Sequence, residues 1–208
     1  MIAIIDYGVG NLFSLSHSLT AVGADAVVTG DAEVICRADH VILPGVGAFG
    51  DAAAKLRETR LDRVVKDAAA AGTPVMGICL GMQLLLDRSS EFGEHDGLGL
   101  IPGEVRPIAE VIGSGLKIPH IGWNALHLRG SHPIFRSIQP GDCVYFVHSY
   151  YGAKCDASVI ATTEYGAELT AAAVARDNVV GCQFHPEKSG NVGLGILKAF
   201  CEWDGDRA

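Results

Sequence analysis

Short apolar runs alternate with longer stretches of helical periodicity through the first half of the chain. Consecutive apolar positions within each run indicate strands that are buried on both faces, which is typical of a parallel sheet covered by helices. The alternation therefore predicts a doubly wound α/β fold with a mostly parallel sheet. The expected strands cover residues 2–6, 26–28, 41–43 and 74–78, and the expected helical stretches cover 11–22, the region that ends at 71, and 82–86.

The second half has a different pattern. Its apolar runs are closely spaced and separated by turn signals such as Asp177-Asn178, so we expect hairpin-like strands that add antiparallel members to the sheet. Apolar positions from 191 to 203 predict a closing amphipathic helix. The runs recur without a linker or repeat, so we expect one domain over residues 1–208. The late strands are expected within residues 143–147, 157–163, 169–175 and 179–184.

Charge and composition narrow the function classes. The formal net charge is -8 and the 16 Lys and Arg residues are scattered singly, which argues against a nucleic-acid partner. The N-terminal residues have no basic segment before their apolar run, and no stretch approaches the roughly 18 apolar residues of a membrane span, so we expect a cytoplasmic protein without membrane contact. The 6 cysteines form no CxxC pair and are expected to be reduced thiols.

One cysteine stands in a distinctive context. The segment Gly77-Ile78-Cys79-Leu80-Gly81 follows an apolar strand and precedes a helix, which is typical of a sharp turn that presents a nucleophile. At a helix N-terminus, unpaired N–H groups favour the thiolate form of Cys79. A buried small apolar side chain is the usual role of a cytosolic cysteine, and we keep that interpretation for the other five.

A candidate base follows the last strand, at His185-Pro186-Glu187. Residues two apart in an extended chain project to the same side, so the His185 imidazole and the Glu187 carboxylate can meet. Pro186 favours an extended His185. The ends of parallel strands share one edge of the sheet, so we expect Cys79, His185 and Glu187 to form a triad there. Cys182 and His185 lie three apart, but no second ligand pair accompanies them, so no metal site is predicted.

A glycine-rich segment, Pro44 to Gly50, follows another strand. Glycines at such a position let backbone N–H groups approach a substrate closely. A phosphate-binding loop is not indicated, because there is no Walker lysine and the spacing is not GxGxxG.

With these pieces placed, the sequence resembles the class I (triad) glutamine amidotransferases over nearly its whole length, and among them the glutaminase subunits of imidazole glycerol phosphate synthase. The resemblance implies a flavodoxin-like sheet. GICLGMQ and FHPE mark the superfamily, whereas PGVGAFG, PHIGWN and YFVHSY are typical of that subunit. The matching segments are IIDYGVGNL (4–12), LPGVGAFG (43–50), GICLGMQLL (77–85), GLGLIPG (97–103), PHIGWN (119–124), YFVHSYY (145–151) and QFHPEKS (183–189).

The resemblance implies roles for further residues. Glutamine is expected to lie against Gly45, Gly47 and Gln83, and Ser149 and Tyr150 are expected to hold its amino-acid end. No cofactor is implied.

The same resemblance implies an oxyanion hole made by the Leu80 N–H and a backbone N–H from the strand 44–47. The peptide backbone of that strand is expected to flip around Val46 when the partner has bound its ligand. Losing one oxyanion donor typically costs ~2.7 to 4 kcal/mol of transition-state stabilisation. If the strand did not flip, the chain would therefore have very little glutaminase activity in the absence of the partner.

The implied partner is a (β/α)8 cyclase that receives the ammonia, in a heterodimer that makes imidazole glycerol phosphate and the aminoimidazole carboxamide ribotide in histidine biosynthesis. Asn11, Trp123 and Lys188 lie in segments that resemble those facing this partner. Each has a simpler interpretation: Asn11 as a helix N-cap, Trp123 as a core residue and Lys188 as a solvated charge.

Two alternatives stay open at this point. One is the amidotransferase subunit of another pathway, such as anthranilate or carbamoyl phosphate synthesis, which PGVGAFG disfavours. The other is a non-enzymatic α/β redox or interaction subunit that uses Cys79 without glutamine chemistry, in which Gln83 and the His185/Glu187 pair would have no purpose.

Overall fold

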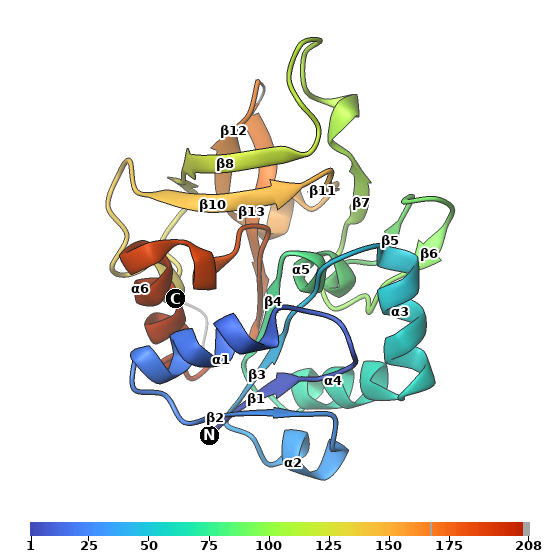
Figure 1. Ribbon diagram of the computed structural model, residues 1–208, viewed down its shortest axis with the longest axis vertical. Coiled ribbons are helices and arrows are strands. Elements are labelled where there is room, and N and C mark those ends of the chain that lie inside the picture. The colour runs from blue at the N-terminus through green and yellow to red at the C-terminus, as the bar shows by residue number, and fades with distance from the viewer. Residues whose placement is uncertain (167, 206–208) are drawn as a thin grey trace.

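The computed structural model describes residues 1–166 and 168–205, and a twisted mixed sheet runs through its centre (Figure 1). The sheet has the order β2-β1-β3-β4-β14-β13-β12-β9. The first five strands in this order are mutually parallel, and the remaining three are antiparallel to their neighbours. Their bounds are β1 Ile2–Ile5, β2 Ala26–Thr29, β3 His40–Leu43, β4 Val75–Ile78, β9 His127–Leu128, β12 Val159–Glu164, β13 Glu168–Arg176 and β14 Val179–Cys182.

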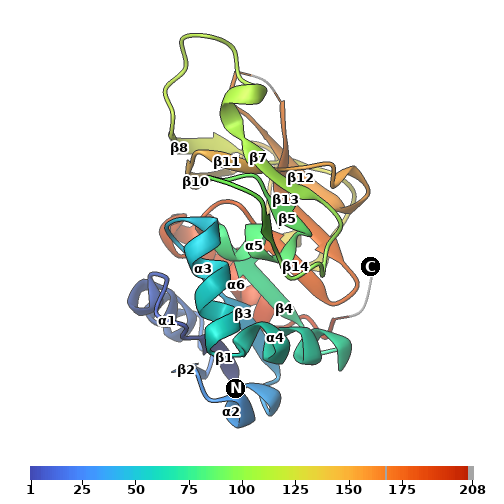
Figure 2. The same cartoon turned by 90° about the vertical axis from the view of Figure 1, so that its right-hand side faces the viewer.

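Helices cover both faces of the parallel part, as Figures 1 and 2 show from two sides. Alternate strand residues point to opposite faces. Ile4 packs in one apolar cluster with α1 and α6, whereas Ile5 packs in the other with α3 and α4. The predicted doubly wound α/β fold is therefore confirmed. The helices are α1 Leu12–Ala21, α2 Ala32–Cys36, α3 Phe49–Glu58, α4 Leu61–Ala70, α5 Leu80–Leu85 and α6 Gly190–Cys201.

One prediction for the outer part of the molecule was wrong. The strand expected at 143–147 does not join the central sheet: β10 (Cys143–His148) pairs antiparallel with β8 (His120–Ala125) in a separate ribbon. The sequence gives a strong signal for β10 but little for β8, which Gly122 interrupts. Short 3-10 turns complete the described chain: η1 Ile108–Glu110, η2 Pro133–Phe135, η3 Asp156–Ser158 and η4 Pro186–Lys188.

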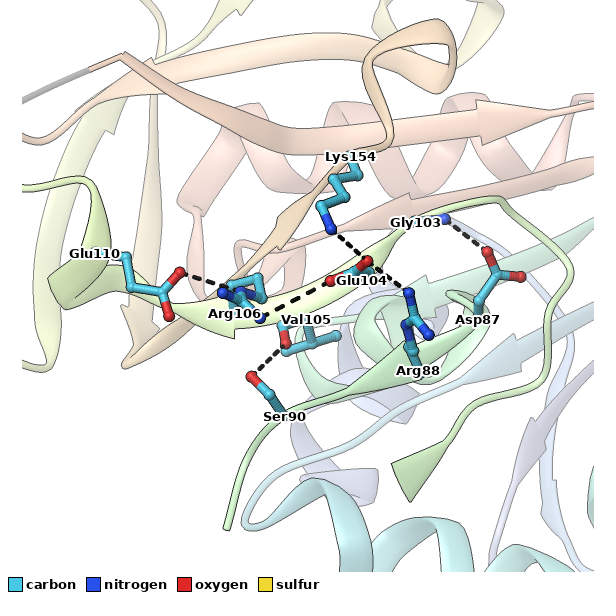
Figure 3. A network of polar contacts seen from close by, with 9 residues as sticks. All are labelled: Asp87, Arg88, Ser90, Gly103, Glu104, Val105, Arg106, Glu110 and Lys154. Carbon is cyan, nitrogen blue, oxygen red and sulfur yellow. Dashed lines mark hydrogen bonds and ion pairs between the residues drawn. The ribbon is translucent and has the colours of Figure 1, made fainter. Parts of the chain in front are cut away.

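A small second sheet lies beside this ribbon, with the order β11-β7-β5-β6, and we did not expect it from the sequence. Buried Glu104 connects three of its segments, because its carboxylate lies 2.8 Å from Lys154 Nζ, 2.9 Å from Arg88 Nη2 and 4.0 Å from Arg106 Nη1 (Figure 3). Hydrogen bonds from Lys154 and then Arg88 lower the pKa of Glu104 to about 2. The strands are β5 Arg88–Ser89, β6 His95–Asp96, β7 Glu104–Pro107 and β11 Tyr150–Ala153.

Within residues 1–166 and 168–205, no helix has both the length and the apolar character needed to cross a membrane.

Candidate active site

The carboxyl ends of four parallel strands lie next to one another at one edge of the central sheet. β1, β3, β4 and β14 are consecutive in the sheet order, so the segments that follow them converge. These segments begin after β1 at Tyr7, after β3 at Pro44, at Gly77 in β4 and after β14 at His185. This is the edge where open α/β sheets bind ligands.

Cys79 sits at a strained turn between β4 and α5. Its φ of 55° and ψ of -110° lie in a region that non-glycine residues rarely adopt, which is typical of functional sites. The flanking glycines permit this turn. A Cβ at Gly81 would collide with the carbonyl oxygen of Leu43, and a Cβ at Gly77 would lie 2.6 Å from the carbonyl oxygen of Gly81. The tight turn therefore places the Cys79 sulfur at the start of α5, where backbone N–H groups have no partner within the helix.

His185 lies between the sulfur and a carboxylate. Its Nδ1 is 2.8 Å from Glu187 Oε1, and both side chains are 3% exposed. Burial lowers the pKa of His185, but hydrogen bonds with Cys79 and Glu187 raise it more strongly, to about 9. Since Nδ1 faces Glu187, Nε2 is left for the sulfur. The three side chains can therefore form a thiol, base and orienting group in series.

The local geometry of the pair differs from the expected one. β14 ends at Cys182, and Glu187 lies in the turn η4 (Pro186–Lys188) rather than in extended chain. His185 itself is extended, with φ -101° and ψ 98°, as its position before proline favours. The turn brings the Glu187 carboxylate to within 2.8 Å of His185 Nδ1. Glu187 Oε2 is buried and has no hydrogen-bond partner within the described chain, so the negative charge acts mainly on His185.

A cavity of about 350 Å³ opens beside Cys79 and His185. This volume lies in the range of small-molecule sites. Gly45, which was predicted to contact glutamine, is not among the described residues that line this cavity; it packs closely against the start of α5, where a Cβ at Gly45 would be 2.8 Å from the Gly81 nitrogen. Seven more of the residues predicted from the sequence line the cavity together with the thiol and the base: Val46, Gly47, Leu80, Gln83, Ser149, Tyr150 and Lys188.

The segment after β3 carries the features expected of an oxyanion strand. Gly47 has a φ of +96°, which a residue with a side chain rarely adopts, and Val46 is 42% exposed. Tyr7 donates a hydrogen bond to the Pro44 carbonyl at 2.8 Å and so anchors the start of the segment. Leu80 begins α5, so its N–H lies at the helix N-terminus. Whether the segment 44–47 donates an N–H to an oxyanion stays a prediction.

Sequence reasoning missed other residues that line the cavity. Glu91 is 8% exposed, and its carboxylate accepts a hydrogen bond from the Phe49 N–H at 2.7 Å, far away in the sequence. His148 donates from Nδ1 to the Tyr150 carbonyl at 2.8 Å. Burial lowers the pKa of His148 to about 4. The YFVHSY motif contains His148 but did not indicate a role for it, whereas no local signal marks Glu91.

The three predicted partner-facing residues have different environments. Asn11 caps α1, where its side chain accepts a hydrogen bond from the Ser14 N–H at 3.4 Å. Trp123 is 55% exposed, so it is not a core residue, and its ring lies 5.9 Å from that of Tyr145. The Lys188 ammonium lies 5.9 Å from the same Tyr145 ring. Trp123 and Lys188 therefore both lie beside the half-buried Tyr145 ring.

Comparison with known proteins places this site in a family. The family described as "Glutamine amidotransferase class-I" matches residues 3–202. The chain is 47% identical over 201 residues to the imidazole glycerol phosphate synthase subunit HisH of Lactococcus lactis, covering 97% of this chain and 98% of that one. It is 49% identical over 205 residues to the subunit of the same name from Geobacter sulfurreducens, again covering 97% and 98%.

Solved structures agree on the fold. The structure of PurLQS from Thermotoga maritima matches with a TM-score of 0.74 at 21% identity and covers 97% of each chain. The glutaminase domain of CTPS from Trypanosoma brucei matches with a TM-score of 0.65 at 16% identity, covering 98% of this chain and 94% of that one. At such low identity these likenesses show the fold alone. The family match and the full-length relatives show that this chain belongs to the class I glutamine amidotransferases.

Proposed function

We propose that this chain is the glutaminase subunit of an imidazole glycerol phosphate synthase, with residues 1–208 as one amidotransferase domain. The observation that carries the proposal is the meeting of Cys79, His185 and Glu187 beside a cavity of about 350 Å³. Relatives with that name, nearly half identical over almost their full length, support the choice of pathway. No cofactor enters the proposed reaction.

The reaction begins when the His185 imidazole takes the proton of the Cys79 thiol. The sulfur attacks the side-chain amide carbon of glutamine, and the oxyanion is held by the Leu80 N–H and a backbone N–H from residues 44–47. The His185 imidazolium then protonates the amide nitrogen, the C–N bond breaks and ammonia leaves. Water attacks the resulting glutamyl thioester, which releases glutamate and restores the thiol. Glu187 keeps the imidazole in the required tautomer.

Glutamine is proposed to lie along the cavity wall, with Gly45, Gly47 and Gln83 beside its side chain. Ser149 and Tyr150 hold its amino-acid end. Buried Glu91 offers this end a carboxylate that is suited to an ammonium group.

The partner is proposed to be a (β/α)8 cyclase that receives the ammonia in a cytoplasmic heterodimer. The exposed face of β8 supports a protein partner, because Trp123 is 55% and Ile121 57% exposed on the same side of the strand. Lys188 lines the cavity and lies beside Tyr145, so it is proposed to join this face to the cavity, and Asn11 is proposed to add a polar contact at the start of α1. Tryptophan in such a setting is a typical interface anchor.

Glutamate release from glutamine tests the proposal when it is measured for the chain alone, with the cyclase, and with the cyclase plus its nucleotide ligand. Strong stimulation that disappears in Cys79→Ala is the expected result. Equal release in all three conditions would indicate a free-standing hydrolase, and no release in any condition would favour a non-enzymatic role.

A further inference from the structure

Gln183 lies beside the nucleophile, although the triad does not include it. It follows β14, is 1% exposed, and its Nε2 is 3.8 Å from Cys79 Sγ. Its backbone N–H donates to the Ala172 carbonyl at 2.9 Å, which fixes the residue to the neighbouring strand β13. A fully buried amide must satisfy its polar groups within the protein, so its contacts are informative.

The direction of the Gln183 amide follows from its neighbours. A backbone carbonyl only accepts hydrogen bonds, so the group of Gln83 that lies 3.2 Å from the Tyr150 carbonyl must be its NH₂. The same NH₂ lies 3.0 Å from the Gln183 amide, which must therefore present its oxygen there. The NH₂ of Gln183 is consequently the group that faces the sulfur. The amide orientation of Gln183 is therefore assigned from the hydrogen bonds that connect Tyr150, Gln83 and Gln183.

The sulfur has two kinds of polar neighbour. The Val147 carbonyl, 4.0 Å away, accepts a hydrogen bond from the neutral thiol only. Once the proton has moved to His185, the sulfur is an acceptor, and the Gln183 N–H points at it. Hydrogen bonds to a charged acceptor are stronger than those to a neutral one. The Gln183 amide therefore favours the thiolate over the thiol.

We propose that Gln183 is a further catalytic residue, whose side-chain N–H donates to the Cys79 sulfur and stabilises the thiolate that attacks glutamine. Gln83 acts as a positioning residue here, because it holds the Gln183 amide in the donating direction. The inference rests on the proposed function only in taking Cys79 as the nucleophile.

The test is the pH dependence of Cys79 alkylation by iodoacetamide, followed by mass spectrometry of the Cys79 peptide in the full chain. Alkylation reports the thiolate fraction. Gln183→Met keeps an unbranched side chain of similar length without an N–H, and Gln183→Glu turns a carboxylate toward the sulfur. We expect the midpoint to move to higher pH by about one unit in Gln183→Met and further in Gln183→Glu.

Gln139→Glu provides the matched control. It makes the same change of charge at an exposed glutamine, so its alkylation midpoint is expected to match that of the unaltered chain. Circular dichroism establishes which variants fold. Because alkylation requires neither glutamine nor the partner, a failure of this proposal is distinct from a failure of the proposed function, which glutamate release tests.

A measurement on the unaltered protein covers the case in which both Gln183 variants fail to fold. The side-chain NH₂ signal of Gln183 in ¹⁵N-labelled protein is expected to move with pH in step with Cys79 alkylation, and to stay constant in Cys79→Ala. An unchanged alkylation midpoint in a folded Gln183→Met, or an NH₂ signal that ignores Cys79 ionisation, would overturn the proposal.

Discussion

Replacing Glu187 with glutamine removes the negative charge that His185 faces and nearly preserves the shape of the side chain. The carboxylate lies 2.8 Å from His185 Nδ1 in a setting where both side chains are 3% exposed. Solvent screens such a buried pair much less than a surface pair. The change therefore acts on the imidazolium directly.

The size of the effect follows from this contact. A buried hydrogen bond to a charged group contributes about 1.5 to 3 kcal/mol, and one pKa unit corresponds to about 1.4 kcal/mol. The pKa of His185, raised to about 9, is therefore expected to fall by about one to two units in Glu187→Gln. The imidazolium would then be lost at lower pH, and the turnover number is expected to fall about 10²- to 10⁴-fold because the tautomer is no longer fixed.

Two assays measure the expected change in the pKa of His185 and in catalysis. Nuclear magnetic resonance titration of the His185 ring follows its protonation in the isolated chain. Glutamate release with the cyclase and its ligand gives the pH profile of kcat/KM, which is expected to fall on the alkaline side near pH 9 because the leaving nitrogen needs a proton. In Glu187→Gln this alkaline limb is expected to move down by about one to two pH units.

Either assay can refute the reasoning. If the His185 ring titrated at the same pH in Glu187→Gln and in the unaltered chain, the carboxylate would not support the imidazolium. A turnover number within about threefold of the unaltered one would exclude the orienting role.

Three further predictions concern other parts of the molecule. Because its cationic neighbours lower the pKa of Glu104 to about 2, its ion pairs stabilise the fold above the ordinary value of 4.5, and this contribution is lost as pH falls toward 2. Urea unfolding should therefore show that Glu104→Gln has a lower free energy of unfolding than the unaltered chain at pH 7, and that this difference shrinks below pH 4.5. The same change at exposed Glu58, in Glu58→Gln, should show no such trend. Gly81→Ala places a methyl against the Leu43 carbonyl and should lower the free energy of unfolding by about 3 kcal/mol or more, and an unchanged denaturant midpoint would contradict this. Trp123→Ala should weaken cyclase binding about tenfold or more in calorimetry without altering the melting temperature, because Trp123 is 55% exposed, and equal affinity would exclude Trp123 as an anchor.

The sequence predicted the central sheet well because each parallel strand is a continuous apolar run with its own local signal. It also predicted β12 and β13, but it failed for several other outer strands for a physical reason. β5, β6 and β9 have two residues each, too few for any periodicity, and β8 contains Gly122. The pairing of β10 with β8 therefore depended on long-range packing that local pattern does not encode.

In the site, too, some residues could be predicted from the sequence and others could not. Cys79 and His185 stand in motifs that are visible in the sequence, and the sheet order brings them to one edge. Gln183 stands in the segment QFHPEKS, but that pattern indicates no role for it, and no local signal marks Glu91. Glu91 is held by the backbone of Phe49, 42 positions away, and Gln183 takes its direction from Gln83, 100 positions away. Only the folded chain brings these groups together.

Whether Cys79 attacks glutamine is tested most directly by mass spectrometry of the chain after incubation with 6-diazo-5-oxonorleucine, an electrophilic glutamine analogue, in the presence of the cyclase and its ligand. We expect one adduct per chain, on Cys79 alone, with loss of glutamate release in proportion to labelling, and no adduct when excess glutamine competes. Glutamate release that continues in Cys79→Ala, or an adduct on another cysteine that abolishes release while Cys79 stays unmodified, would contradict this assignment of the nucleophile.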